Sequence, residues 1–259
     1  MRAISLQSGS NGNCIYVETS GARFLVDAGL SVKETERRLA SVGRRLSDIH
    51  ALLLTHEHTD HSLSAGVLSN RYGIPTYVTA ATEEALACRG NGAGLASARY
   101  FSPGNCLYFG SVRIETVPTP HDSAEGSAFV INDGGLRLGI LTDLGHVFDG
   151  LGTVVRSLDA VFLESNYDPD MLKRGKYPAF LKKRITGPGG HISNDESARL
   201  VAEAGKVFSW VCLSHLSGEN NTPDVAAEAY RQVVGPRQEI HVAPRDRMGD
   251  LLVVSRAVG

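Results

Sequence analysis

The sequence has no long apolar run, no closely paired cysteines and no excess of charge of one sign. No stretch approaches the roughly 18–20 apolar residues that a membrane span needs, and Met1–Ser5 turns polar without the apolar core of a signal peptide. The four cysteines, at positions 14, 88, 106 and 212, form no Cys-x-x-Cys pair, so a zinc ribbon is not expected. We expect a cytoplasmic protein with reduced cysteines and no membrane partner.

The charges nearly cancel, with 26 Lys and Arg against 28 Asp and Glu and a formal net charge of -2. Overall charge therefore gives no sign of a nucleic-acid binder, although one local basic stretch does. There is no low-complexity linker and no repeat at a fixed period. Residues 1–259 are accordingly predicted to form a single mixed α/β domain.

Short apolar runs alternate with glycine-rich turns and with stretches of helical spacing. Strands are expected at 15–17, 23–26, 51–54, 112–117, 128–131, 136–141, 160–163 and 210–213. Helices are expected at 32–42, 62–72, 194–204 and 222–233, the third of them capped by Asn194. Turns at 20–21 and 133–135 predict two hairpins.

The segment Thr55–His61 carries four side chains that can bind a metal, directly after a predicted buried strand. These are His56, His58, Asp60 and His61. Neutral imidazole and carboxylate are the ligands that zinc and similar divalent ions use. A lone histidine is more often solvated or packed, but a cluster of this kind favours a metal site.

Three later residues occupy a similar place relative to a strand. His121, Asp143 and His215 each come shortly after an apolar run, which places each side chain at a sheet edge. Each is weak evidence alone. Together with the loop they supply enough ligands for two ions.

The order His-x-His-x-Asp-His, then His, Asp and His, resembles the metallo-β-lactamase superfamily, as does the early segment Leu25–Gly29. The resemblance covers nearly the whole chain and implies a four-layer αββα sandwich, with two mixed sheets between helical layers. It implies one divalent ion on His56, His58 and His121, a second on Asp60, His61 and His215, and Asp143 bridging both. Asp27 would orient the ligands, although an ordinary turn aspartate is an equally good interpretation.

Asp143 bears on the kind of hydrolase. True β-lactamases of this superfamily usually carry a cysteine here, so a carboxylate argues against antibiotic hydrolysis. A bridging carboxylate suits two ions that share one hydroxide and stabilise displacement at phosphorus. Zinc and manganese both suit these ligand types, and iron also fits.

Two further motifs resemble the superfamily's tRNA 3′-processing nucleases. Gly190–Asn194 resembles their Gly-His-Ser-Thr segment, and Phe162–Asn166 matches their His-Glu-Ala-Thr segment at Glu164. By this resemblance His191 contacts the scissile phosphate or protonates the leaving oxygen, and Glu164 fixes the tautomer of His191. A loop histidine near a helix cap and an ordinary strand-end acid are the alternatives.

A basic stretch with interleaved aromatic residues precedes His191. It comprises Lys173, Arg174, Lys176, Tyr177, Phe180, Lys182, Lys183 and Arg184. Cationic side chains bind phosphates, and aromatic faces stack on bases. A solvated helix face would explain the charges equally well, but the place next to His191 favours contact with a substrate strand.

Several short motifs in the same order resemble the YycJ/WalJ-like family, a compact branch associated with 5′→3′ exonuclease activity, chiefly on DNA. These motifs are Ser8–Asn13, Gly190–Asn194, Ser214–Ser217 and Glu219–Asn221. By this resemblance Ser10, Asn11 and Asn13 would line the site, and Ser10, Asn11 and Asn220 would bind substrate. A glycine-rich turn uses such residues in any case.

The favoured interpretation is a dinuclear-metal phosphodiesterase, a 5′→3′ exonuclease acting on DNA single strands or ends through a metal-bridging hydroxide. Asp60 would also hold or deprotonate the water, and His191, backed by Glu164, would protonate the leaving oxygen. Two alternatives use the same ligands. One is a small-molecule hydrolase, either a glyoxalase II-like thioesterase or a cyclic-nucleotide phosphodiesterase, and the other is a non-catalytic metal- or nucleic-acid-binding member. The sequence leaves the metal, the polarity of digestion and the oligomeric state undetermined.

Overall fold

Two sheets form the centre of the protein, and the computed structural model describes residues 1–89 and 94–256. The first sheet contains β1 (Arg2–Gln7), β2 (Cys14–Glu18), β3 (Arg23–Val26), β4 (Ala51–Leu53), β5 (Thr76–Val78), β6 (Ala98–Tyr100) and β14 (Leu252–Val253), in the order β14-β1-β2-β3-β4-β5-β6. The second contains β7 (Cys106–Phe109), β8 (Val112–Pro118), β9 (Ser127–Asp133), β10 (Leu136–Leu141), β11 (Ala160–Glu164), β12 (Trp210–Ser214) and β13 (Ile240–Val242), in the order β13-β12-β11-β10-β9-β8-β7.

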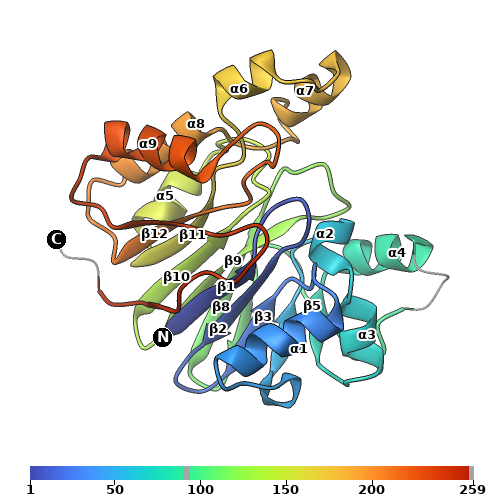
Figure 1. Ribbon diagram of the computed structural model, residues 1–259. Coiled ribbons are helices and arrows are strands. Elements are labelled where there is room, and N and C mark those ends of the chain that lie inside the picture. Colours follow the sequence, from blue (N-terminus) through green and yellow to red (C-terminus); the bar gives the residue numbers. More distant parts are fainter. Residues whose placement is uncertain (90–93, 257–259) are drawn as a thin grey trace.

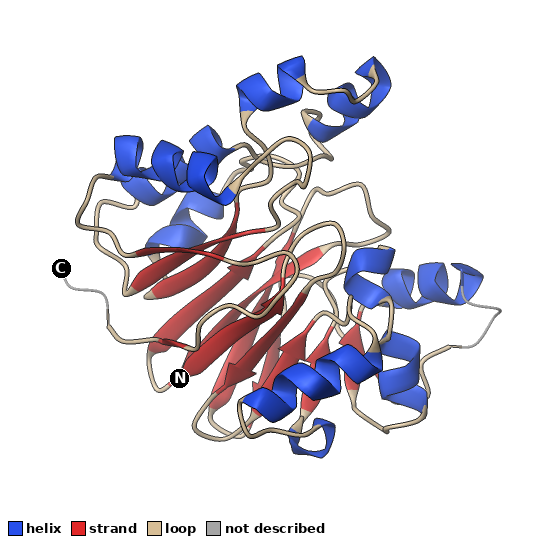
Figure 2. Ribbon diagram, in the orientation of Figure 1, coloured by secondary structure: helices blue, strands red, loops and turns tan. Residues whose placement is uncertain are grey.

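Helices cover the outer faces of both sheets (Figure 1). They are α1 (Val32–Ser41), α2 (Thr59–Ser62), α3 (Ala65–Asn70), α4 (Ala80–Arg89), α5 (Leu151–Arg156), α6 (Pro169–Arg174), α7 (Ala179–Ile185), α8 (Asn194–Glu203) and α9 (Pro223–Val234), with a short 3-10 helix at Leu46–Asp48. Figure 2 shows the strands between two groups of helices, so the predicted αββα sandwich is confirmed. No helix within the described ranges is long and apolar enough to cross a lipid bilayer.

Most expected elements are present, and both predicted hairpins pair antiparallel, β2 with β3 and β9 with β10. The helix expected at 62–72 is present but shorter, because α2 ends at Ser62 and α3 spans Ala65–Asn70. Ser64 separates them, since its amide and its hydroxyl both donate to the carbonyl of Ala28. The cap of α8 is Ser193 rather than Asn194. Ser193 forms a reciprocal capping box with Glu196, which satisfies two backbone amides at once.

Strand direction brings the candidate ligands to one rim. Strands β3 to β6 pair in parallel, and so do β10 to β13. Strand β8 is antiparallel to β9, which is antiparallel to β10, so β8 and β10 end on the same side. Because the carboxyl ends of strands that run in one direction meet at one edge, the segments that follow β8, β10, β11 and β12 are neighbours.

Three apolar layers hold this arrangement. Phe24, Phe129, Phe162 and Trp210 are buried between the sheets, and the rings of Phe162 and Trp210 meet edge to face at 5.1 Å. Separate clusters lie under the helices of the first sheet and under those of the second. Burying each large apolar side chain contributes about 1.5–3 kcal/mol to the free energy of folding. The strands that carry the rim residues are therefore held in place by a well-packed core.

Helices α6 and α7 form a separate unit beyond the α8–α9 layer (Figure 1). A small apolar cluster joins them, with Tyr167, Leu172 and Ile185 buried and Tyr177 and Leu181 packed alongside. These two helices carry the basic stretch.

Candidate metal-dependent active site

A cavity of about 220 Å³ lies at the rim, where the loops after β4, β8, β10 and β12 meet. Its lining includes His58, Asp60, His121, Asp143, His191 and His215. Residues from four strand ends and from the segment before α8 therefore face one space, as their sequence positions predicted.

All seven candidate ligands belong to overlapping groups whose donor atoms lie within 4.8 Å of one another. Two of these groups are His56, His58 and His121, and Asp60, His61 and His215. Asp143 forms a third with His56 and His61, and a fourth with Glu164, His191 and His215. The carboxylate of Asp143 lies 3.2 Å from Nε2 of His61 and 3.6 Å from Nε2 of His121. Its location between the two groups is compatible with a bridging role.

Three of the candidate ligand histidines, His56, His61 and His121, are fixed through one ring nitrogen. Nδ1 of His121 donates to the carbonyl of Gly190 at 2.9 Å, and Nδ1 of His61 donates to Asp27 at 2.7 Å. The hydroxyl of Thr55 also donates to Asp27, so it accepts from Nδ1 of His56 at 2.9 Å. In each case Nε2 is left as the lone-pair nitrogen, which is the form that binds a metal.

Two buried atoms make the case for a cation. Nε2 of His56 and Oδ2 of Asp143 have no hydrogen-bond partner among the described residues, although both are shielded from solvent. Such atoms are rare because an unsatisfied buried polar group costs about 1–3 kcal/mol. A divalent ion would satisfy both lone pairs, so the residues present fit the metal site.

Backbone strain is concentrated at the same rim. Within the described ranges, Asp27, Asp143 and His215 are the non-glycine residues with positive φ, at 64°, 56° and 57°. Each follows closely on the end of a strand. This conformation is rare outside glycine, and its clustering here means that the surrounding contacts hold these three side chains in place.

The loop that carries His56 to His61 is hydrogen-bonded to the residue before β2 and to the turn after β3. The amide of Asn13 donates to the carbonyl of Asp60 at 2.7 Å, and Ala28 donates to the carbonyl of His61. A Cβ atom on Gly29 would lie only 1.8 Å from the carbonyl oxygen of Asp60. Position 29 therefore requires glycine, which explains the Asp-Ala-Gly segment.

The site favours positive charge. Burial would raise the pKa of Asp60, but the hydrogen bond from His215 and the nearby His61 outweigh it and hold that pKa below its usual value. Burial would lower the pKa of His61, yet Asp143 and Asp27 together raise it to about 9. Burial lowers the pKa of His56 well below its usual range. The buried carboxylates therefore make the rim a place that favours positive charge, as a bound divalent ion would supply.

Glu164 and His191 form a hydrogen-bonded pair beside Asp143. Glu164 is fully buried, and Oε1 lies 2.6 Å from Nδ1 of His191. The other oxygen of Glu164 accepts from the amide of Leu144 at 2.9 Å. Because Nδ1 of His191 faces Glu164, Nε2 is the nitrogen available to a substrate in the cavity.

Comparison with known proteins agrees with this geometry. The family profile described as "Beta-lactamase superfamily domain" matches residues 22–215. The chain belongs to the metallo-β-lactamase superfamily. It is 34% identical over 244 residues to the exodeoxyribonuclease YycJ of Bacillus anthracis, which covers 91% of this chain and 92% of that relative. It is 36% identical over 224 residues to the exodeoxyribonuclease WalJ of Streptococcus pneumoniae, covering 85% and 83%.

Solved structures share the fold of this superfamily member. The metallo-β-lactamase fold protein YhfI of Bacillus subtilis superposes with a TM-score of 0.74 at 19% identity, over 96% of this chain and 99% of that one. The short form of human tRNase Z superposes with a TM-score of 0.65 at 16% identity, over 98% and 100%. Family membership and the His/Asp cluster together make the protein a metal-dependent hydrolase that binds divalent metal.

The predicted substrate residues of this hydrolase divide into two sets. Ser10 and Arg184 line the metal cavity, whereas Asn11, Lys182 and Lys183 do not. The guanidinium of Arg184 makes a two-pronged ion pair with Asp122, at 2.6 and 2.9 Å. Arg184 is therefore the cationic member of the basic stretch that lines the metal cavity.

Asn220 cannot contact a substrate in this conformation. It is fully buried, its amide donates to the hydroxyl of Ser217, and its carbonyl accepts from the amide of Asp168. The backbone of Asn220 thus holds the loop after β12 against the start of α6. The burial of Asn220 excludes contact with a substrate, and the sequence motif did not indicate that this residue would be buried.

Four further residues contribute to the cavity or to its ligands. Tyr177, Asn166 and Ser217 line the cavity, and Asn13 places its amide nitrogen 3.0 Å from Nε2 of His61. Asn166 donates to the carbonyl of His215 at 2.8 Å. Asn13 was expected at the site from the Ser8–Asn13 motif, and Tyr177 belongs to the basic stretch. Asn166 and Ser217 lie within the motifs that resemble the family, but their types are too common to be chosen from the sequence.

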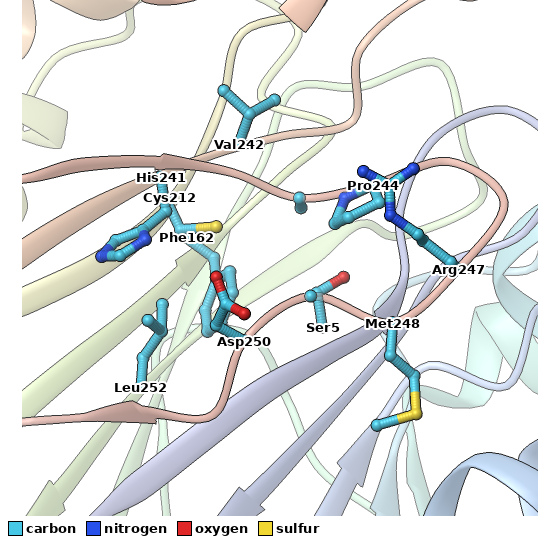
Figure 3. A pocket seen from close by; sticks show the side chains of 12 residues that line it. Ser5, Phe162, Cys212, His241, Val242, Pro244, Arg247, Met248, Asp250 and Leu252 are labelled. Carbon is cyan, nitrogen blue, oxygen red and sulfur yellow. The ribbon is translucent and has the colours of Figure 1, made fainter.

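Another pocket, of about 170 Å³, lies between the sheets near β13 and is separate from the metal site (Figure 3). Ser5, Cys212 and His241 are among its lining residues. None of the metal-ligand groups in the described part of the chain includes a residue of this pocket. The cavity at the rim is therefore the candidate active site.

Proposed function

We propose that the protein is a 5′→3′ exodeoxyribonuclease that releases nucleotides from DNA single strands or ends. The observation that carries the proposal is that His191 and Arg184, two side chains of types suited to binding phosphate, line the cavity that holds the candidate ligands. The similarity to YycJ and WalJ, both named exodeoxyribonucleases, supports DNA as the substrate.

The proposed metal site holds two divalent ions, zinc or manganese, with iron also compatible with the ligands. One ion would lie on His56, His58 and His121, and the other on Asp60, His61 and His215, with Asp143 between them. Such ions supply Lewis-acid stabilisation of the charge that develops on the phosphoryl oxygens and activate water.

Three side chains act directly on the substrate in this proposal. Asp60 is ionised and part-exposed at the cavity, so it accepts a hydrogen bond from the attacking water and orients it. His191 donates the proton on Nε2 to the leaving O3′ as the P–O3′ bond breaks. Glu164, held by Leu144, stabilises the protonated ring. Arg184, held by Asp122, donates to a non-bridging phosphoryl oxygen.

The walls of the cavity favour a strand end. Tyr177 and Leu181, from the α6–α7 unit, close one part of it. A volume of about 220 Å³ is below the roughly 300–1,000 Å³ of common ligand pockets, so the cavity is too small for a base pair. We therefore assign the reacting end of a single strand to this space, with the ring of Tyr177 available to stack on a base.

Digestion of strands labelled at either end tests the proposal. Metal-loaded protein is incubated with 5′-phosphorylated single-stranded DNA, with the same sequence as RNA, and with a thioester. We expect mononucleotides from DNA, with the 5′ label released first. Protein carrying D143N, purified in parallel, controls for a contaminating nuclease.

Other outcomes would decide between the alternatives. Early release of the 3′ label would reverse the polarity, and faster digestion of RNA would change the substrate. Intact DNA together with a cleaved thioester would support a small-molecule hydrolase. Bound metal without turnover of any ester would support a non-catalytic member.

A further inference from the structure

A groove of about 680 Å³ adjoins the metal cavity. It is formed by Asn11, by the loop after β12 and the start of α9, and by residues 242–247 after β13. Ser217 lines both the cavity and the groove, so the two spaces meet at this side chain. The groove is about three times as large as the cavity and extends the candidate active site along the surface.

We infer that this groove binds the part of the DNA strand that follows the terminal nucleotide. The inference rests on the proposed nuclease function, because it supposes a phosphodiester chain with one end at the metals. A small-molecule hydrolase would have no use for a binding surface beyond Ser217. The groove would thus distinguish a polymer substrate from a small one.

The lining suits a single strand. Pro223, Val242 and Pro244 supply apolar surface against which sugars can lie. Arg245 and Arg247 supply positive charge, against the one acidic side chain Asp246. A positively charged groove that follows the phosphate backbone is how proteins bind single-stranded nucleic acid with little sequence preference.

Arg247 is the positively charged side chain best placed to bind a phosphate of the strand. Its side chain is 75% exposed, and its ion pair with Asp246 spans 3.5 Å between two exposed groups. Such a pair contributes little, so the guanidinium can exchange it for a phosphate at small cost. Arg247 also borders the smaller pocket, where it lies on the side away from His241 (Figure 3).

The groove is preformed by contacts between its walls. The guanidinium of Arg245 donates to the carbonyl of Leu216 at 2.8 Å, and Asn11 donates to the carbonyl of Arg245 at 2.8 Å. Arg38, a buried residue of α1, donates to the carbonyl of Asp246 at 3.1 Å. A surface that is rigid before binding loses less entropy when a strand occupies it. Asn11 therefore belongs to the groove rather than to the metal cavity.

A length series tests the inference. Hydrolysis of 5′-phosphorylated oligothymidylates, from a dinucleotide to a strand of about twelve nucleotides, is compared for the wild type and R247E. For the wild type we expect kcat/KM to rise with length. For R247E we expect the KM of the longest strand to rise about tenfold more than that of the dinucleotide, and the dependence of KM on salt to weaken.

The matched control is R231E. Arg231 on α9 is also exposed and also pairs with an acidic neighbour, Glu228, at 3.4 Å, but it does not line the groove. We expect R231E to follow the wild type at every length, and R247Q to show a smaller effect than R247E.

Two results would overturn the inference alone. One is equal kcat/KM for short and long strands in the wild type, and the other is identical behaviour of R247E and R231E. In both cases hydrolysis of DNA would still stand. If the wild type cleaves no oligonucleotide of any length, the nuclease proposal fails and the groove inference fails with it.

Discussion

Nδ1 of His191 donates a hydrogen bond of 2.6 Å to Oε1 of Glu164, a carboxylate without solvent exposure. The pair comes from β11 and from the segment before α8, and both residues belong to one ligand-like group with Asp143 and His215. His191 could thus serve as an acid or as a further ligand. Its partner Glu164 and its place on the cavity wall favour the acid.

Replacing His191 separates these roles. We expect H191A to lower kcat by about 10²–10⁴-fold, because the leaving oxygen would depart without a proton. We expect metal content, measured by elemental analysis of the purified protein, to equal that of the wild type. A loss of metal in step with activity would make His191 a ligand instead.

The substitution D143N tests the bridging carboxylate. Asparagine tolerates the left-handed conformation of this residue, so the fold should remain intact. Removing the charge should weaken metal binding and lower activity at least about 100-fold, as measured by metal titration and hydrolysis. D143A adds backbone strain, and we expect it to unfold at a lower temperature than D143N. Full metal occupancy in D143N would contradict the assignment.

Asp27 acts through its neighbours. It accepts hydrogen bonds from the amide and hydroxyl of Thr55 and from Nδ1 of His61. We expect D27N to reduce metal affinity by about 10–100-fold, because the amide can no longer fix His61 as a donor at Nδ1. Metal titration by calorimetry measures this. An unchanged dissociation constant would leave Asp27 as an ordinary turn residue.

Arg184 and Lys183 are adjacent cations in different settings. Arg184 lines the cavity and is held by Asp122, whereas Lys183 is exposed outside it. We expect R184Q to lower kcat/KM on DNA by about 10–100-fold through a lost charge-assisted hydrogen bond, and K183Q to have a much smaller effect. Equal losses would mean that the basic stretch acts only through its overall charge. D122N should resemble a mild R184Q, since it releases the guanidinium.

A pH dependence of stability follows from Glu34. Hydrogen bonds from Arg37 and Arg38 lower the pKa of Glu34 from 4.5 to about 2. A carboxyl group whose pKa is lower in the folded protein than in the unfolded chain stabilises the fold at pH values above its usual pKa. This contribution disappears as the pH falls from 4.5 towards 2. Because the side chain of Glu34 is 31% exposed, we expect roughly 1 kcal/mol or less.

Urea unfolding of the metal-free protein measures it. The difference between wild type and E34Q should be present at pH 6 and should vanish near pH 2, while E36Q, on the exposed face of α1, should match the wild type throughout. A difference that grows on acidification would contradict the sign. Arg38 also supports the carbonyl of Asp246, so E34Q should loosen the proposed strand groove slightly.

The sequence by itself determined the candidate metal ligands and the family. His56 to His61 are close in the chain, and they are therefore close in any fold. His121, Asp143 and His215 were identified because each follows an apolar strand, and strands that run in one direction end at one edge. The mixed α/β class followed from the same strand pattern, and the αββα layers followed from the resemblance.

Only the tertiary structure decided the rest. Strands of two or three residues, such as β5, β6, β13 and β14, are too short to show a period, and their pairing comes from neighbours distant in sequence. Of the three adjacent cations on α7, Arg184 lines the cavity, whereas Lys182 and Lys183 do not. The guanidinium of Arg184 is held by Asp122, 62 residues earlier in the sequence. Asn220 is buried and therefore cannot contact a substrate. The groove was recognised because Ser217 lines both it and the metal cavity. The exposure of a side chain and its distant partners depend on how elements pack, and one-dimensional spacing does not contain that information.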